Sequence, residues 1–204
     1  MKPIERYAGR LGWLALSCCI AVLSSACAST SPTRYFALEA VAPASPARLD
    51  ASAPIAYGGP PIEVRSVQIP PTLDRLEMVR EIAPGELDVR DFDHWAAPLA
   101  RMSRQVLTED LASRLPPDRL IFPGAAGPAV RGSLTVDVLS FRIDAGTATM
   151  VMSWALAWPD QPSPRGASLQ LTTSAVGDAA STSRAWSTLM AQAADHIAAD
   201  LHTH

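Results

Sequence analysis

Clustered carboxylates are the side chains of this sequence that could most directly do chemistry. Asp74 and Glu77 lie three residues apart, and Asp88, Asp91 and Asp93 follow within one short polar stretch. Two carboxyl groups held close together can act as general acid and general base when their surroundings separate their pKa values. Exposed strand ends carry such residues routinely, so these clusters alone do not predict catalysis.

The histidines give an equally weak indication. They are His94, His196, His202 and His204, and the last two stand beside Asp200 at the chain end. A metal site needs ligands on a stable frame, whereas a chain end frays. The sequence has no Gly-x-Ser-x-Gly elbow, no paired-cysteine metal motif and no glycine-rich phosphate loop. We therefore predict that the protein is not an enzyme and has no metal ion or cofactor.

Cys27 is the residue whose flanking sequence indicates a covalent modification. The chain opens with a basic segment that contains Lys2, Arg6 and Arg10 and continues with a mostly apolar run over residues 11–23. That layout is typical of a secretory signal peptide. The apolar run is shorter than the roughly 20 residues that a membrane-spanning helix needs.

The sequence around Cys27 resembles the lipobox of bacterial lipoproteins, in which a small residue precedes a cysteine that is diacylated and becomes the new N-terminus. Ala26 fits, whereas the usual leucine stands one place early, at Leu23. The resemblance implies a signal peptide over residues 1–26 and acyl chains, palmitate among them, on Cys27. Ala28, in place of an aspartate that often retains such proteins in the inner membrane, favours the outer membrane. An ordinary secreted protein and an uncleaved anchor are the alternatives.

Removal of the signal peptide would leave an acidic chain. Three of the 17 basic and one of the 20 acidic residues lie in that segment, so the remainder carries 14 basic and 19 acidic residues. Nucleic-acid binding needs clustered Lys and Arg, and the sequence has no basic stripe. Residues 27–33 form a lipidated tether that spans at most about 20 Å. We therefore expect residues 34–204 to fold as a single domain close to a membrane.

Alternating apolar residues predict several strands before the first helix. The segments are RYFALEAV (34–41), IEVRSVQI (62–69), LEMVREI (76–82) and GELDVRD (85–91). A loop rich in proline and alanine, over residues 42–61, separates the first strand from the second.

In residues 95–115 the spacing of apolar side chains changes from the alternation of a strand to a helical period, which predicts an amphipathic helix. Apolar side chains recur every three to five positions from Trp95 to Leu115. Asp93 is the expected N-cap, and Pro98 is tolerated because it would lie in the first turn.

A meander and a second helix fill the rest of the chain. Residues 129–144 are typical of a strand, but their apolar parity changes near Leu139, which predicts a β-bulge. The letters DAGT turn the chain, and strands over residues 147–158 and 167–176 follow. A second amphipathic helix, behind a Ser/Thr cap region, ends the chain. These elements predict an α/β sandwich, with a mixed, largely antiparallel sheet covered by two amphipathic helices.

One strand of the meander has an unusual apolar face. It comprises Met150, Met152, Trp154, Leu156 and Trp158. Such a face is either ordinary core or a groove for lipid, because methionine adapts to varied ligands.

Two motifs resemble the PqiC-like ABC-type transport auxiliary lipoproteins. The first is IPPTLDRLEMV (residues 69–79), where Leu-Asp-Arg follows a proline, and the second is HWAAPL (residues 94–99). The letters RYFAL approximate the aromatic first strand of that family. The resemblance runs through the mature chain in order and implies an α/β sandwich without enzymatic activity.

The resemblance also implies partners. Members of that family work with a mammalian-cell-entry (MCE) protein that bridges the periplasm and with inner-membrane transporter components, and some form rings. We therefore expect an outer-membrane-anchored, non-catalytic auxiliary subunit of an MCE/ABC-type lipid transport system that maintains envelope integrity. A homo-oligomeric ring and contact with lipid are part of that expectation.

Pro71, Asp74, Arg75 and Trp95 are the candidate residues for assembly or partner contact. Proline fixes φ and ends strand pairing, so a rigid corner could direct Asp74 and Arg75 at a partner. Two local alternatives exist. Asp74 could hydrogen-bond within its own turn, and Trp95 could fill the seam between sheet and helix.

Two other functions stay open. A stand-alone periplasmic lipid-binding lipoprotein would enclose its ligand with the Met/Trp face. A periplasmic hydrolase would need a nucleophile and a base, and the sequence shows no such pair.

Overall fold

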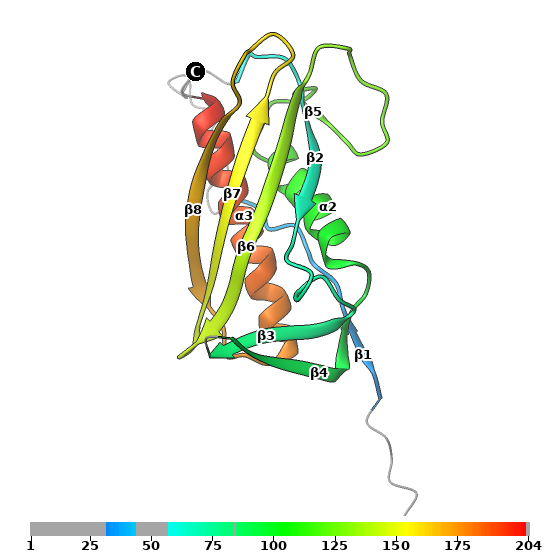
Figure 1. Cartoon of the computed structure of the whole chain (residues 1–204). Coiled ribbons are helices and arrows are strands. Elements are labelled where there is room, and N and C mark those ends of the chain that lie inside the picture. The colour runs from blue at the N-terminus through cyan, green and yellow to red at the C-terminus, as the bar shows by residue number, and fades with distance from the viewer. Residues whose placement is uncertain (1–31, 44–56, 84, 203–204) are drawn as a thin grey trace, which may run out of the picture. The chain divides into compact units, whose positions relative to one another are not determined.

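A meander of three long strands forms the centre of the fold (Figure 1). β6 (Gly132–Asp144), β7 (Thr147–Ala157) and β8 (Arg165–Ser174) pair antiparallel in that order. Between β6 and β7, Ala145 and Gly146 have φ angles of 45° and 81°. A two-residue hairpin turn that matches the strand twist needs this left-handed backbone. The letters DAGT therefore turn the chain where the sequence predicts.

The computed structural model describes residues 32–43, 57–83 and 85–202, and Thr33–His204 forms one compact unit. The predicted signal peptide, Cys27, most of the tether and most of the proline- and alanine-rich loop lie outside the described residues. Among the described helices, none is both long and apolar enough to span a membrane.

Five further strands complete one sheet of eight. They are β1 (Arg34–Phe36), β2 (Ile62–Gln68), β3 (Glu77–Ala83), β4 (Glu86–Trp95) and β5 (Leu120–Ile121). Because β7 occupies one edge of β6, both β2 and β3 lie along the other edge. β2 pairs with the first half of β6, whereas β3 meets β6 only at Arg142. β3 and β4 therefore turn away as a hairpin that crosses one end of the meander, with β1 parallel to the end of β4 (Figure 1).

Two helices, α2 (Leu99–Ala112) and α3 (Ala179–His202), cover one face of the sheet (Figure 1). Each buries an apolar stripe at helical spacing. The stripes include Leu99, Val106, Leu107 and Leu111 of α2 and Trp186, Leu189, Met190, Ile197 and Leu201 of α3. Most of the paired strand residues belong to antiparallel ladders. The structure thus confirms the mixed, largely antiparallel α/β sheet with two amphipathic helices.

A β-bulge keeps the long strand β6 in phase with the core. The register of β6 against β7 shifts between Val138 and Ser140. Leu139 is 57% exposed, while Val138 and Phe141 on either side are buried. The extra residue returns the apolar side chains to the helix-covered face, which confirms the bulge that the parity change predicts.

The first helix begins later than the sequence predicts. Trp95 is the last residue of β4, and α2 begins at Leu99. Asp93 is wrong as the expected N-cap, because it is buried in β4 and forms an ion pair with Arg34 at 2.6 Å. The error arises because a buried strand residue, Trp95, precedes Leu99 by four positions, which is also the spacing of one helical turn.

The second helix also has a different cap from the one predicted. α3 begins at Ala179, and the Asp178 carboxylate accepts a hydrogen bond from the Ser181 amide at 2.6 Å. The Ser/Thr region expected to form the cap lies inside the helix, where Thr182 and Ser183 are buried.

The segment after β1 is held by the helices and is not a strand. β1 ends at Phe36, although the alternating pattern continues to Val41. Side chains of α2 and α3 bind the backbone in place of a strand neighbour. These bonds run from Ser183 Oγ to the Ala37 carbonyl oxygen (2.6 Å), from the Glu39 amide to Ser187 Oγ (3.1 Å) and from the Val41 amide to Asp110 Oδ1 (2.8 Å).

Candidate functional site

The proline corner between β2 and β3 is a closed backbone turn. The amides of Leu73 and Asp74 both donate to the carbonyl oxygen of Pro70, at 2.8 and 3.0 Å. The Leu73 side chain is buried and anchors the turn in the core. Pro71, in contrast, is exposed. The corner therefore has a fixed conformation and an open outer surface.

Asp74 connects this corner to helix α2. Its Oδ1 accepts a hydrogen bond from the backbone amide of Ala100 at 3.1 Å. Pro98 occupies the N-cap position of α2 and supplies no side-chain acceptor, and the first turn contains no acidic residue. A helix start leaves amides without partners, and a carboxylate there also interacts favourably with the helix dipole. Asp74 thus supplies from a distance the cap that the helix sequence lacks.

A backbone bond joins the same two segments. The Trp95 amide donates to the Leu76 carbonyl oxygen at 2.7 Å, and Glu77 lies opposite His94 in the β3–β4 ladder. The motifs IPPTLDRLEMV and HWAAPL are thus direct neighbours in space. Fourteen residues, 80–93, separate them in the sequence, which does not show this contact.

Arg75 has a different environment from Asp74. Its side chain is 49% exposed, and its guanidinium lies 3.4 Å from a Glu77 carboxylate oxygen. A hydrogen bond from the Glu77 backbone amide, together with the Arg75 charge, lowers the pKa of that carboxyl. An exposed ion pair of this kind contributes little to folding, because solvent and salt screen it. Arg75 is therefore available for another contact at little cost in stability.

Trp95 lies in the seam between sheet and helix. It is 2% exposed, and its ring stands edge-on to Trp186 of α3 with the ring centroids 6.3 Å apart. Trp186 in turn packs on Phe141 at 4.7 Å and donates a hydrogen bond to Ser103 Oγ at 2.9 Å. Trp95 thus fills the seam between sheet and helix, which is the structural alternative to partner contact, and its ring is buried.

The Met/Trp face of β7 is core. Met150, Met152, Trp154 and Leu156 are at most 4% exposed, and they belong to one hydrophobic cluster with both helices. Side chains fill the space that a lipid groove on this face would need.

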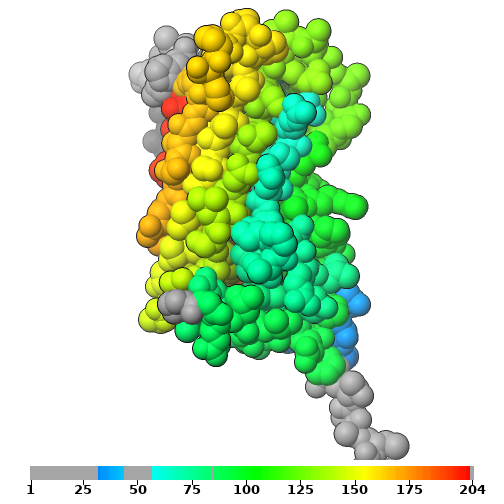
Figure 2. Space-filling model, viewed as in Figure 1, coloured from blue at the N-terminus to red at the C-terminus, as the bar shows by residue number. Residues whose placement is uncertain are grey.

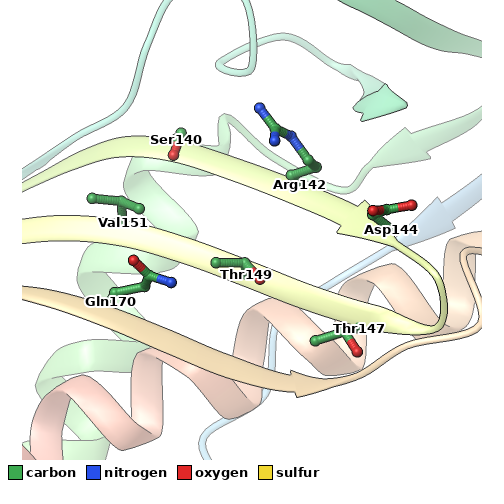
Figure 3. A pocket seen from close by; sticks show the side chains of 7 residues that line it. All are labelled: Ser140, Arg142, Asp144, Thr147, Thr149, Val151 and Gln170. Atoms are coloured by element: carbon green, nitrogen blue, oxygen red, sulfur yellow. The ribbon is translucent and has the colours of Figure 1, made fainter. Parts of the chain in front are cut away.

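The opposite face of the meander is polar and open. Figure 3 shows side chains of β6, β7 and β8 that project away from α3 and line a shallow depression of about 480 Å³. Its lining residues are Ser140, Arg142, Asp144, Thr147, Thr149, Val151 and Gln170. Hydroxyl, amide and charged groups dominate, and Arg142 is held by Glu81 at 3.1 Å. This surface suits hydrogen bonds to a protein or to water better than an acyl chain.

A second depression, of about 650 Å³, lies between residues 35–42 and α3. Aromatic and aliphatic side chains line one wall together with Glu39, while Ser183, Arg184, Ser187 and Thr188 line the other. Of the two depressions, this mixed groove is the better suited to an apolar ligand.

Three of the clustered carboxylates, Glu77, Asp88 and Asp93, form ion pairs with arginines. Asp88 interacts with both Arg80 and Arg90, and the hydrogen bond from Arg80 is the main reason that the pKa of Asp88 is lowered. Asp93 pairs with Arg34, and the His94 ring stands edge-on to Tyr35 at 5.8 Å. Across residues 32–43, 57–83 and 85–202, no group of three metal-ligating side chains comes together.

One buried charged cluster has no clear signal in the sequence. Asp110 of α2 is 1% exposed, accepts the Val41 amide and lies 3.7 Å from Arg114. Arg114 also binds Asp195 of α3 at 2.6 Å. Burial raises the pKa of Asp110 to about 6. The cluster joins both helices to the segment that follows β1.

A comparison with protein families decides what kind of protein carries this fold. The model of the family described as "ABC-type transport auxiliary lipoprotein component" matches residues 36–198. The chain belongs to this family. The match spans every element from the end of β1 to most of α3, so the whole fold of this auxiliary lipoprotein is the family domain.

Solved structures give the same fold for the auxiliary lipoprotein. One, titled as an uncharacterized protein, has 19% identity and a TM-score of 0.63, over 83% of this chain and 99% of its own. Another, protein XCC0632 from Xanthomonas campestris, has 15% identity and a TM-score of 0.59, over 84% of this chain and 95% of its own. At these identities the likeness concerns the fold. The curated proteins give no match.

The family confirms part of what the motifs predict. The chain is an auxiliary transport component of lipoprotein type, which favours a non-catalytic role and a membrane-associated, periplasmic location.

Proposed function

We propose that the protein is an outer-membrane-anchored periplasmic lipoprotein and a non-catalytic auxiliary subunit of an MCE/ABC-type lipid transport system that maintains envelope integrity. The observation that carries the proposal is the family match over the whole folded domain. The signal-like N-terminus with Cys27 supports the anchor, and Ala28 supports the outer membrane. Acyl chains on Cys27 would anchor the chain, since each buried methylene contributes about 0.8 kcal/mol.

The proposed partners are an MCE-domain protein that spans the periplasm, the inner-membrane transporter components and further copies of this chain in a ring. The exposed corner of Pro71 and Arg75, beside the capping Asp74, is the proposed contact surface. Two hydrogen bonds from backbone amides hold this surface in place. The Trp95 amide donates to the Leu76 carbonyl oxygen, and the Ala100 amide donates to the Asp74 carboxylate.

The experiment that tests this function is a mild-detergent pull-down of the lipidated protein from its own envelope, analysed by mass spectrometry. We expect recovery of an MCE-domain protein together with transporter components. Arg75→Ala should weaken that recovery without loss of stability. Arg101→Ala, at an exposed arginine on α2, is the matched control and should leave recovery unchanged.

The second candidate is a stand-alone lipid-binding lipoprotein, and the mixed groove between residues 35–42 and α3 is the observation in its favour. Native mass spectrometry separates the two functions. An empty oligomer that recovers an MCE-domain protein supports the transport subunit, whereas a monomer that carries lipid and recovers no partner supports the alternative.

A further inference from the structure

Exposed apolar side chains gather at one end of the domain. This end, called the anchor end here, consists of β1, β3, β4 and the loop of residues 175–178. It carries the following large apolar side chains that are at least 39% exposed: Tyr35, Ile82, Leu87, Val89, Phe92 and Val176. Large apolar side chains that stay exposed at one end of a domain can mark an interaction site.

Specific contacts hold these elements together. β4 pairs with β3 along one edge, and β1 pairs with β4 only at Asp93–Trp95. The Arg80 guanidinium of β3 binds the Gly177 carbonyl oxygen, which places the loop with Val176 beside the hairpin. Figures 1 and 2 show β3 and β4 across the lower end of the domain, where β1 begins.

The first strand of the domain belongs to the same end. Thr33 immediately precedes β1 and stands six positions after Cys27 in the sequence. A chain of that length spans at most about 20 Å when fully extended. If Cys27 carries acyl chains, the start of β1 therefore lies within about that distance of the bilayer, and β1 belongs to the anchor end.

The charges of this end fit a neutral lipid surface. Ion pairs with arginines compensate Asp88 and Asp93. Glu86 and Asp91 are exposed and acidic, so attraction to anionic lipids does not favour binding. The favourable contribution must come from apolar and aromatic side chains, which partition to the boundary between headgroups and acyl chains. Tyr35 is 68% and Phe92 45% exposed, and both lie on the strands next to the tether.

We propose that the anchor end is a membrane-docking surface that inserts Tyr35, Leu87 and Phe92 into the headgroup region of the leaflet that holds the Cys27 acyl chains. This inference rests on the proposed lipidation of Cys27. Docking would fix the orientation of the domain, with the meander upright and the end that carries β5 and residues 122–131 directed away from the membrane (Figure 1).

The experiment uses the full lipidated protein in nanodiscs made mostly of phosphatidylethanolamine. Phe92→Cys and Tyr35→Cys carry an environment-sensitive fluorophore, and Leu87→Cys provides a third position. The matched control is Phe122→Cys, an exposed aromatic position at the opposite end, 49% exposed in the native chain. Cys18 and Cys19 leave with the signal peptide and Cys27 is acylated, so each introduced thiol is unique.

We expect a blue-shifted emission at positions 35, 87 and 92, and at least twofold quenching when doxyl-labelled lipid replaces part of the bilayer. The label at position 122 should show neither effect, and added salt should leave the result unchanged. Labels at 35 and 92 that behave like the one at 122 overturn the proposal. A blue shift without lipid quenching also overturns it, since it would place a second protein copy or a partner on this surface.

Mass spectrometry of the N-terminal peptide separates failure of the docking surface from failure of the proposed lipid anchor on Cys27. An acylated Cys27 with unquenched labels overturns only the docking surface. An unmodified Cys27 overturns the anchor itself, and with it the docking that rests on it.

Discussion

The Asp74 carboxylate lies 3.1 Å from the backbone nitrogen of Ala100, 26 residues further along the chain. Through this bond the corner after β2 caps a helix that has no capping side chain of its own. The prolines before Asp74 fix the corner, so the acceptor is held in place at the helix start. The Leu-Asp-Arg motif thus has a structural role before any contact with a partner.

Asp74→Ala should lower the free energy of unfolding by about 1 kcal/mol, because removal of an N-terminal capping acceptor typically costs 0.5–2 kcal/mol. Asp74→Asn keeps an acceptor oxygen and should recover most of that loss. Urea unfolding of the mature chain, followed by circular dichroism, measures both variants.

Asp91→Ala is the matched control for the cap, since Asp91 is an exposed aspartate on β4. It should leave stability within about 0.5 kcal/mol of the wild type, as surface substitutions usually do. An Asp74→Ala chain as stable as this control would contradict the capping role and leave partner contact as the reason for the aspartate.

The regular parts of the fold follow from local pattern. The alternation of apolar and polar residues predicts β2, β6 and β7. The change in this alternation at Leu139 predicts the bulge, because a period of two changes phase only when a residue is inserted. The amphipathic stripes give both helices, although not their ends. Trp95 and Leu99 show why, since a buried strand residue and a buried helix residue can stand at helical spacing by coincidence.

The long-range contacts do not follow from local pattern. The sequence identifies Asp74 and Trp95 as important but does not show that the segments around them touch. Asp110 reads as one more polar residue of an amphipathic helix, and only its position against Val41 and Arg114 reveals a buried charge. Exposed residues such as Tyr35 and Phe92 look like ordinary strand residues until the fold places β1 beside the end of β4.

Trp95→Ala should lower the free energy of unfolding by about 3–5 kcal/mol, as expected when a large buried aromatic side chain is truncated. The reason is its position between β4 and Trp186. Thermal and urea unfolding measure the loss, and Phe122→Ala, at an exposed aromatic residue, should have little effect. A stable Trp95→Ala protein that no longer recovers its partners would instead make Trp95 an interface residue.

Asp110 should make stability depend on pH between about 4 and 6. Its pKa is about 6 in the folded state against 3.8 as the ordinary value, so the folded chain binds this proton more tightly than the unfolded chain. The contribution to stability is therefore present at low pH and is lost as the pH rises through this window. At about 1.4 kcal/mol per pKa unit, the loss is about 3 kcal/mol at pH 7.

Asp110→Asn tests this dependence. The amide oxygen still accepts the Val41 amide, while the buried charge is gone. We expect a more stable chain at pH 7 and a flatter stability profile between pH 4 and 6 from urea unfolding at several pH values. Asp195→Asn, on the exposed side of the same cluster, should keep the slope. If the unfolding free energy of Asp110→Asn still depends on pH between 4 and 6 as in the wild type, another group is responsible for the titration.

Cys27→Ala should remove the protein from the outer membrane without a change in fold. Cys27 lies outside the compact unit Thr33–His204, so the substitution changes no residue of that unit. Fractionation of the envelope should move the variant into the soluble periplasmic fraction, or leave it unprocessed in the inner membrane, and its unfolding curve should match that of the wild type. Because the proposed function needs the domain at the outer membrane, the variant should also fail to restore envelope integrity in a deletion strain. Full complementation by Cys27→Ala would show that the anchor is dispensable.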